Sequence, residues 1–175
     1  KNEIIREELI EEIYQFDPFT FDSIALSLRI IREEDDEIVF GNLLHFLLSN
    51  ILKCLRSSND ECDECFEELN VLINTQKIKL DEKVPSSNEN QEESVTESIT
   101  IWNYFKEIAR FLLTAFDWKD NTSDFFLFVL NKVNDDELSD LLKTLNHLIH
   151  KFLLEESLIK AAFIVENKPE KREFI

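Results

Sequence analysis

The sequence has very few of the residues that break helices or build tight turns. Among 175 residues there are one glycine and three prolines, too few for the many turns of a β-rich fold. This scarcity favours long helices on short connections. Hydrophobic residues make up 43% of the chain and charged residues 32%, a balance that predicts a folded protein and not a disordered one.

Other absences limit the class of protein. Methionine is missing and the chain opens at Lys1, so we expect a piece of a longer polypeptide. No stretch reaches the roughly 18 consecutive apolar residues of a membrane span, and no signal-peptide pattern opens the chain. We therefore expect an intracellular protein. Three cysteines make a disulfide framework improbable.

Basic residues are scarce in the first half of the chain. Residues 1–98 carry 24 acidic and 9 basic side chains, a net charge of -15, whereas residues 99–175 carry 13 and 10, a net charge of -3. Because an acidic surface repels phosphate backbones, the first half is a poor candidate for contact with nucleic acid. A solvated acidic face that keeps the protein soluble is the simpler interpretation.

The most apolar stretch, Ile99–Asp120, predicts one long core helix. Its polar residues recur at steps of three and four and form a single narrow stripe, so other elements must cover the remaining faces. Phe40–Leu55 repeats this pattern and predicts a second core helix. The first stripe consists of Asn103, Lys106, Glu107, Arg110, Thr114 and Asp117, and the second of Asn42, His45, Ser49, Asn50, Lys53 and Arg56.

Local signals predict the remaining helices and their connections. Asp17 or Thr20 can cap a helix, and Asn134 and Glu137 form a capping-box-like pair that opens an amphipathic helix through Leu153. Phe125–Leu130 could be a buried strand, but its helical neighbours favour a buried helix. The other expected helices are Asn2–Phe16, Phe21–Ile31, Cys62–Ile73 and Glu156–Val165, with an acidic connector at Glu33–Glu37 and a turn at Asn121–Asp124.

Together these elements predict an all-α fold of about seven or eight helices. Because several helices are apolar nearly all round, an α-solenoid of irregular antiparallel helix pairs is favoured over a four-helix bundle. Residues 1–74 and 99–175 would be two helical-repeat segments of the same solenoid. Residues 75–98, rich in Ser, Asn, Gln and Glu, would be a polar, mobile insertion between them.

Candidate chemistry is sparse. Cys62-x-x-Cys65 has the spacing of half a zinc site, and His147-x-x-His150 could supply the other half. Lys143 and Lys151 beside those histidines would repel a metal, and Asp60, Glu61, Asp63 and Glu64 disfavour a reactive thiolate. Ordinary, partly buried cysteines are the simpler interpretation. With the single glycine Gly41 there is no glycine-rich phosphate loop, and we predict no catalytic residue, metal ligand or cofactor.

One local basic cluster exists, formed by Lys143, His147, His150 and Lys151. These residues recur along one face of the helix expected after Asn134. They could contact phosphate or an acidic partner. A plain exposed face is the simpler interpretation.

The order of the apolar helices resembles that in the Fanconi anaemia group D2 family. The segments that carry the likeness are YFKEIARFLLTAFDW (104–118), FFLFVLNKV, LSDLLKTLNHLIHKF and LIKAAFIV, preceded by FDSIALSLRI (21–30) and VFGNLLHFLLSNILKCL (39–55). They match the central to C-terminal helical region of that family. Asn121-Thr122-Ser123 departs from the more apolar or glycine-bearing turn expected there, and residues 75–98 have no counterpart that can be aligned.

The resemblance implies a non-enzymatic α-solenoid subunit of a nuclear DNA clamp that repairs interstrand crosslinks. Its implied partners are the paralogous Fanconi anaemia group I subunit, double-stranded DNA and the ubiquitin ligase of the pathway. Monoubiquitination in that family targets a lysine outside the matching region, so no acceptor lysine is expected here. A generic helical adaptor that binds a partner peptide and a small metal-dependent enzyme are the alternatives.

Overall fold

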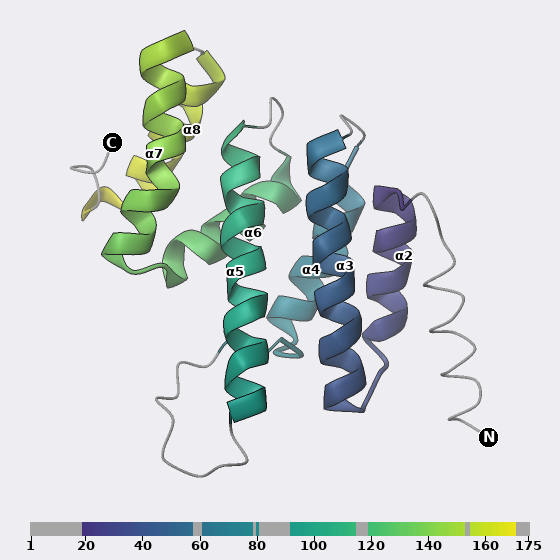
Figure 1. The fold of residues 1–175 in the computed structure, drawn as a ribbon. Coiled ribbons are helices and arrows are strands. Elements are labelled where there is room, and N and C mark those ends of the chain that lie inside the picture. The colour runs from purple at the N-terminus through teal and green to yellow at the C-terminus, as the bar shows by residue number, and fades with distance from the viewer. Residues whose placement is uncertain are drawn as a thin grey trace. The chain divides into compact units, whose positions relative to one another are not determined.

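The computed structural model describes residues 19–57, 61–78, 80, 92–114, 119–152 and 155–170, except for the side chains of 92–100, 145–152 and 155–158. In these ranges the chain forms seven helices and no strand, which confirms the all-α prediction (Figure 1). The helices are α2 (Phe21–Ile31), α3 (Glu37–Ser57), α4 (Asp63–Asn74), α5 (Glu92–Thr114), α6 (Asp120–Lys132), α7 (Asp135–Phe152) and α8 (Glu155–Asn167). The helix expected over Asn2–Phe16 lies outside the described residues.

The chain divides into two compact units, Lys1–Ile78 (unit 1) and Lys79–Ile175 (unit 2). Each contains helices that pack around apolar side chains. The solenoid arrangement expected from the sequence remains a prediction.

In unit 1, α2 packs against both α3 and α4. The first turn of α2 is closed as expected by Thr20, whose hydroxyl accepts from the Ser23 N–H at 3.2 Å, while Ser23 Oγ accepts from the Thr20 N–H at 3.0 Å. This reciprocal cap fixes where the helix begins. The apolar face expected for α2 is buried, and it consists of Phe21, Ile24, Ala25, Leu28 and Ile31.

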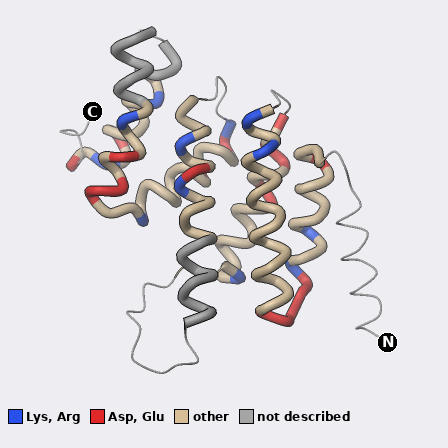
Figure 2. Tube along the Cα trace, viewed as in Figure 1, with Lys and Arg blue, Asp and Glu red and all other residues tan. Residues whose placement is uncertain are grey.

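Helix α3 begins three residues earlier than the sequence suggested. Asp36 Oδ1 accepts from the backbone N–H groups of Ile38 at 2.9 Å and Val39 at 3.1 Å, so Asp36 acts as the N-cap and Glu37 belongs to the helix. The expected connector is therefore one residue shorter, and Figure 2 shows it as an acidic corner between α2 and α3. Asn50, expected on the polar stripe, is 4% exposed, and its amide donates to the Phe46 carbonyl.

The segment after α4 returns to the α2–α3 corner. Gln76 takes a left-handed backbone angle, φ 57°, which reverses the chain after the helix. Lys77 then donates to the Glu34 carbonyl, and its ammonium lies 5.6 Å from the centre of the Phe40 ring. This cation thus links the end of α4 to the acidic corner and to α3.

Helix α3 is the one described helix long and apolar enough to span a membrane, and half of the relevant stretch is buried inside the protein. A helix at the centre of a folded core can have the same length and apolar composition as a membrane span, so this feature alone does not distinguish the two.

In unit 2, α5 packs against α6, α7 and α8. Phe105 of α5 is fully buried and meets two rings of α6 edge to face, Phe125 at 5.3 Å and Phe128 at 6.1 Å between ring centres. Such pairs add to the free energy gained from apolar burial. The assignment of Phe125–Leu130 to a buried helix is confirmed.

The prediction of a single helix over Ile99–Asp120 is wrong at both ends. Helix α5 starts at Glu92, so it includes residues 92–98, and it is described as far as Thr114, while Asp120 already belongs to α6. The prediction of a turn at Asn121–Asp124 is also wrong, because these residues belong to α6. Thr122 Oγ accepts from the Lys119 N–H at 2.9 Å and donates to the Lys119 carbonyl at 2.8 Å, which starts α6 there.

A buried lysine of α8 lies against the last described turn of α5. Lys160 is 4% exposed, and its ammonium donates to the carbonyls of Leu112 at 3.2 Å and Leu113 at 3.0 Å. Hydrogen bonds from a charged donor are stronger than those between neutral groups. Lys160 therefore links α8 to α5.

Candidate functional site: the polar groove between α5 and α7

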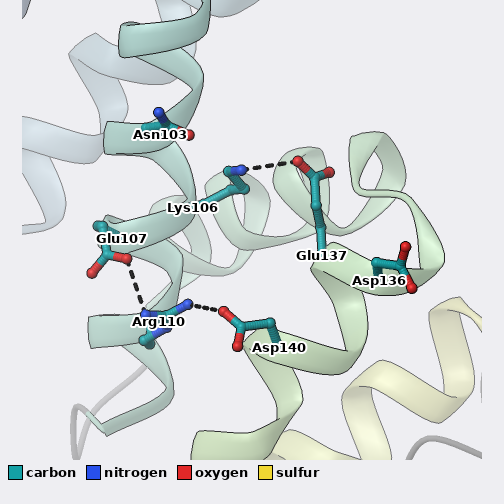
Figure 3. A pocket seen from close by; sticks show the side chains of 7 residues that line it. All are labelled: Asn103, Lys106, Glu107, Arg110, Asp136, Glu137 and Asp140. Carbon is teal, nitrogen blue, oxygen red and sulfur yellow. Dashed lines mark hydrogen bonds and ion pairs between the residues drawn. The ribbon is translucent and has the colours of Figure 1, made fainter.

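Two basic residues of the polar stripe expected on the core helix are paired with acidic residues of α7. Lys106 Nζ lies 2.9 Å from Glu137 Oε1, and the Arg110 guanidinium pairs with Asp140 (Figure 3). Arg110 also lies 3.0 Å from Glu107 on its own helix. This part of the stripe therefore forms ion pairs between two helices, while Asp117 lies outside the described residues.

Glu137 is the most connected side chain of this groove. Oε2 accepts from the Asn134 N–H at 3.2 Å, and Asn134 Oδ1 accepts from the Glu137 N–H at 2.9 Å, which confirms the expected capping box. Oε1 accepts from Lys106 and, at 3.2 Å, from Trp102 Nε1. Partial burial acts to raise the pKa of Glu137, but the hydrogen bonds and the Lys106 charge outweigh it, so the pKa lies below its usual value.

Asp140 lies among cations on the open side of the groove. It pairs with Arg110 and, at 3.3 Å, with Lys143. The hydrogen bond from Lys143 and the charge of Arg110 lower the pKa of Asp140. Because its side chain is 55% exposed, water and salt screen these attractions.

The groove is an open, polar cavity of about 470 Å³. Its lining comes from α5 and α7 and comprises Asn103, Lys106, Glu107, Arg110, Asp136, Glu137 and Asp140. Both cations are paired with carboxylates, and acids outnumber bases in the lining, so the groove is poorly suited to an anion such as phosphate. The ion pairs in this groove hold α7 against α5.

The basic cluster expected from the sequence is described only in part. Lys143 is exposed and paired with Asp140, while the side chains of His147, His150 and Lys151 lie outside the described residues. Contact of this cluster with phosphate or an acidic partner remains a prediction.

The cysteines gather at one end of unit 1. Cys62 is partly exposed at the N-cap of α4, Cys65 is 1% exposed, and Cys54 of α3 is buried with its thiol donating to the Phe19 carbonyl at 3.3 Å. Burial, followed by the nearby Cys62 and Cys54 thiols and the Glu64 carboxylate, raises the pKa of Cys65 well above its usual value. Among the described residues no three metal-binding side chains converge, and a zinc site completed by His147 and His150 stays untested because those side chains are not described.

A second set of ion pairs in unit 1 was not foreseen. Arg29 of α2 donates to Glu68 of α4 at 2.8 Å and to Glu64 at 3.1 Å, and Arg32 lies 3.6 Å from Glu68. Glu68 is only 8% exposed. The sequence offered one signal for this site, an acidic residue on the otherwise apolar face of α4.

Comparison with known proteins adds no identification: no family model, no curated protein and no solved structure matches the chain. The resemblance to the Fanconi anaemia group D2 family remains a prediction from the order of the helices.

Proposed function

We propose that this chain is a non-enzymatic helical scaffold that holds other proteins. The observation that carries the proposal is how its charged side chains are used. In both units a basic and an acidic side chain pair across two helices, Arg29 with Glu68 and Lys106 with Glu137. Such pairs fix the relative positions of helices, which is what a rigid binding surface requires.

Exposed aliphatic side chains provide candidate contacts for a partner. Among the described residues the large apolar side chains that remain exposed are Leu26 (50%), Ile38 (67%) and Ile159 (63%). A partner protein that covered one of them would gain the free energy of apolar burial. We expect at least one of these positions to lie in an interface.

The particular form of the proposal follows from the sequence resemblance. We infer a subunit of a DNA clamp in the nucleus that pairs with a paralogous group I subunit, encloses double-stranded DNA and acts in interstrand crosslink repair. It would be regulated by the ubiquitin ligase of the pathway, which in that family modifies a lysine outside the region that resembles this sequence. The order of the helices from Phe21 to Val165 supports it. The acidity of residues 1–98 argues against a DNA contact by that part of the chain.

The test is reconstitution from purified components. The full chain is mixed with the group I subunit from the same source, and complex formation is measured by size-exclusion chromatography and calorimetry. A stoichiometric complex that Ile38→Asp or Ile159→Asp weakens about tenfold or more supports the proposal. Glu166→Gln, an exposed change on α8, is the matched control and should leave the affinity unchanged.

Two results would overturn parts of this proposal separately. If the group I subunit does not bind but another protein, found by crosslinking in cells and then purified, forms a stoichiometric complex, the chain is a general helical adaptor. If no purified protein found in that way binds, the scaffold function itself is wrong.

A further inference from the structure

The first turn of α4 brings two cysteines onto the same side of the chain. Cys62 is the N-cap of α4 and Cys65 is three residues further on, at the position where a capping-box side chain would turn back towards the N-cap. The turn is closed, because the Phe66 N–H donates to the Cys62 carbonyl at 3.1 Å. Helical residues three apart have Cα atoms about 5 Å apart, within the roughly 4.4–6.8 Å that a disulfide bridges.

Burial differs sharply between the two thiols. Cys62 is partly exposed, so a reagent from solution can reach it, whereas Cys65 is 1% exposed. The N-cap side chain of Cys62 makes no capping hydrogen bond. The third thiol, Cys54, belongs to α3 and donates to the Phe19 carbonyl. The pair thus has one accessible member and one sheltered member.

We propose that Cys62 and Cys65 form a thiol–disulfide exchange site for small disulfides of the glutathione class. The Cys62 thiolate attacks one sulfur of the small disulfide, a mixed disulfide forms, and one glutathione thiolate leaves and takes up a proton. The Cys65 thiol then gives its proton to solvent and attacks the Cys62 sulfur. The bond to the second glutathione breaks, and that glutathione also leaves as a thiol. Two protein thiols are oxidised and one small disulfide is reduced to two thiols.

The surroundings of the site predict slow exchange. Glu61, Asp63 and Glu64 flank the two cysteines, and negative charge disfavours the thiolate that starts the reaction. Burial of Cys65 and its raised pKa slow the second step as well. Exchange should therefore be faster at high salt, which screens the carboxylates. This site goes beyond the proposed scaffold function and does not depend on it.

The experiment uses the full chain and oxidised glutathione. The reduced protein is incubated with an excess of the disulfide, free thiols are blocked with an alkylating reagent after unfolding, and peptides are identified by mass spectrometry. We expect an internal disulfide between Cys62 and Cys65, with Cys54 still free to be alkylated. Cys65→Ser should stop at the mixed disulfide on Cys62, and Cys62→Ser should slow glutathione incorporation about tenfold or more.

The matched control is Cys54→Ala, which removes the third thiol and should leave the internal disulfide between Cys62 and Cys65 as the product. Circular dichroism of each variant checks that the helices form, and the wild-type peptide map tests the proposal even if a variant does not fold. The proposal is overturned if the wild type stops at a mixed disulfide, if Cys54 appears in the internal disulfide, or if all three thiols remain free.

Discussion

The two units link their helices with ion pairs that differ in burial. In unit 1 the Glu68 carboxylate is 8% exposed and receives Arg29 and Arg32 of α2, while the exposed Glu64 also pairs with Arg29. In unit 2 Lys106 and Arg110 pair with Glu137 and Asp140, and the Asp140 side chain is 55% exposed. A carboxylate removed from water loses more when its partner is lost than one that water and salt can reach. Similar contacts should therefore contribute unequally to stability.

The largest expected effect comes from the apolar centres of the units. Phe66 and Phe105 are both fully buried, and replacing either by alanine should lower the free energy of unfolding by about 3–5 kcal/mol. In hydrogen exchange, the backbone amides of α2–α4 should lose protection in Phe66→Ala, and those of α5–α7 should lose protection in Phe105→Ala. A loss below about 1 kcal/mol in either unit would mean that its core does not centre on that ring.

The second-largest loss of stability should come from replacing the buried Lys160 of unit 2. Lys160→Met keeps the length of the side chain but leaves the Leu112 and Leu113 carbonyls without this donor, so we expect a loss of about 2–3 kcal/mol in urea denaturation. Lys143→Met, at a side chain that is 72% exposed, is the control and should change stability by less than about 0.5 kcal/mol. Equal effects of the two changes would contradict a stabilising role of the buried Lys160 contacts.

The comparison of the two carboxylates can be tested directly. Glu68→Gln should cost about 1–2 kcal/mol, because two guanidinium groups lose a charged acceptor at a buried site. Asp140→Asn should cost less. In about 1 M salt, where the screening length is about 3 Å, the effect of Asp140→Asn should vanish while that of Glu68→Gln persists. A larger loss for Asp140→Asn in low salt would reverse the comparison.

The smallest expected effect is a pH dependence in unit 2. Because the pKa of Glu137 is lowered in the folded protein, its contribution is complete above the unfolded value of about 4.3 and is lost as the pH falls through the folded value. The free energies of unfolding of the wild type and Glu137→Gln can be measured by urea denaturation with tryptophan fluorescence as the signal. The wild type should be more stable at pH 7, and this difference should shrink below about pH 4. A constant difference between pH 7 and pH 3 would exclude this role of Glu137.

Local signals allowed much of the fold to be predicted. The bounds of α2 and its Thr20 cap, the helix through Phe125–Leu130 and the Asn134–Glu137 box all follow from residues within a few positions of each other. The end of α5 could not be predicted in this way. Periodicity alone continued the helix through Trp118 to Asp120, and the contact of Lys160 from α8 with the Leu112 and Leu113 carbonyls has no signal in the local sequence.

The candidate site shows the same limit. The stripe containing Lys106 and Arg110 was located on the core helix from its spacing, but the acids that pair with it lie about 30 residues further along the chain. Spacing shows which residues share a face and does not show which helix covers that face. Likewise the Cys62–Cys65 spacing is visible in the sequence, whereas the burial of Cys65 is not.

One carboxylate oxygen of Glu137 bonds within its own helix, and the other bonds to a neighbouring helix. Oε2 closes the first turn of α7 through the Asn134 N–H, and Oε1 receives Lys106 and Trp102 of α5. One rotamer must satisfy both sets of bonds, so the start of α7 and its docking on α5 favour the same side-chain position. Local helix formation and tertiary assembly are thereby made cooperative by one carboxylate.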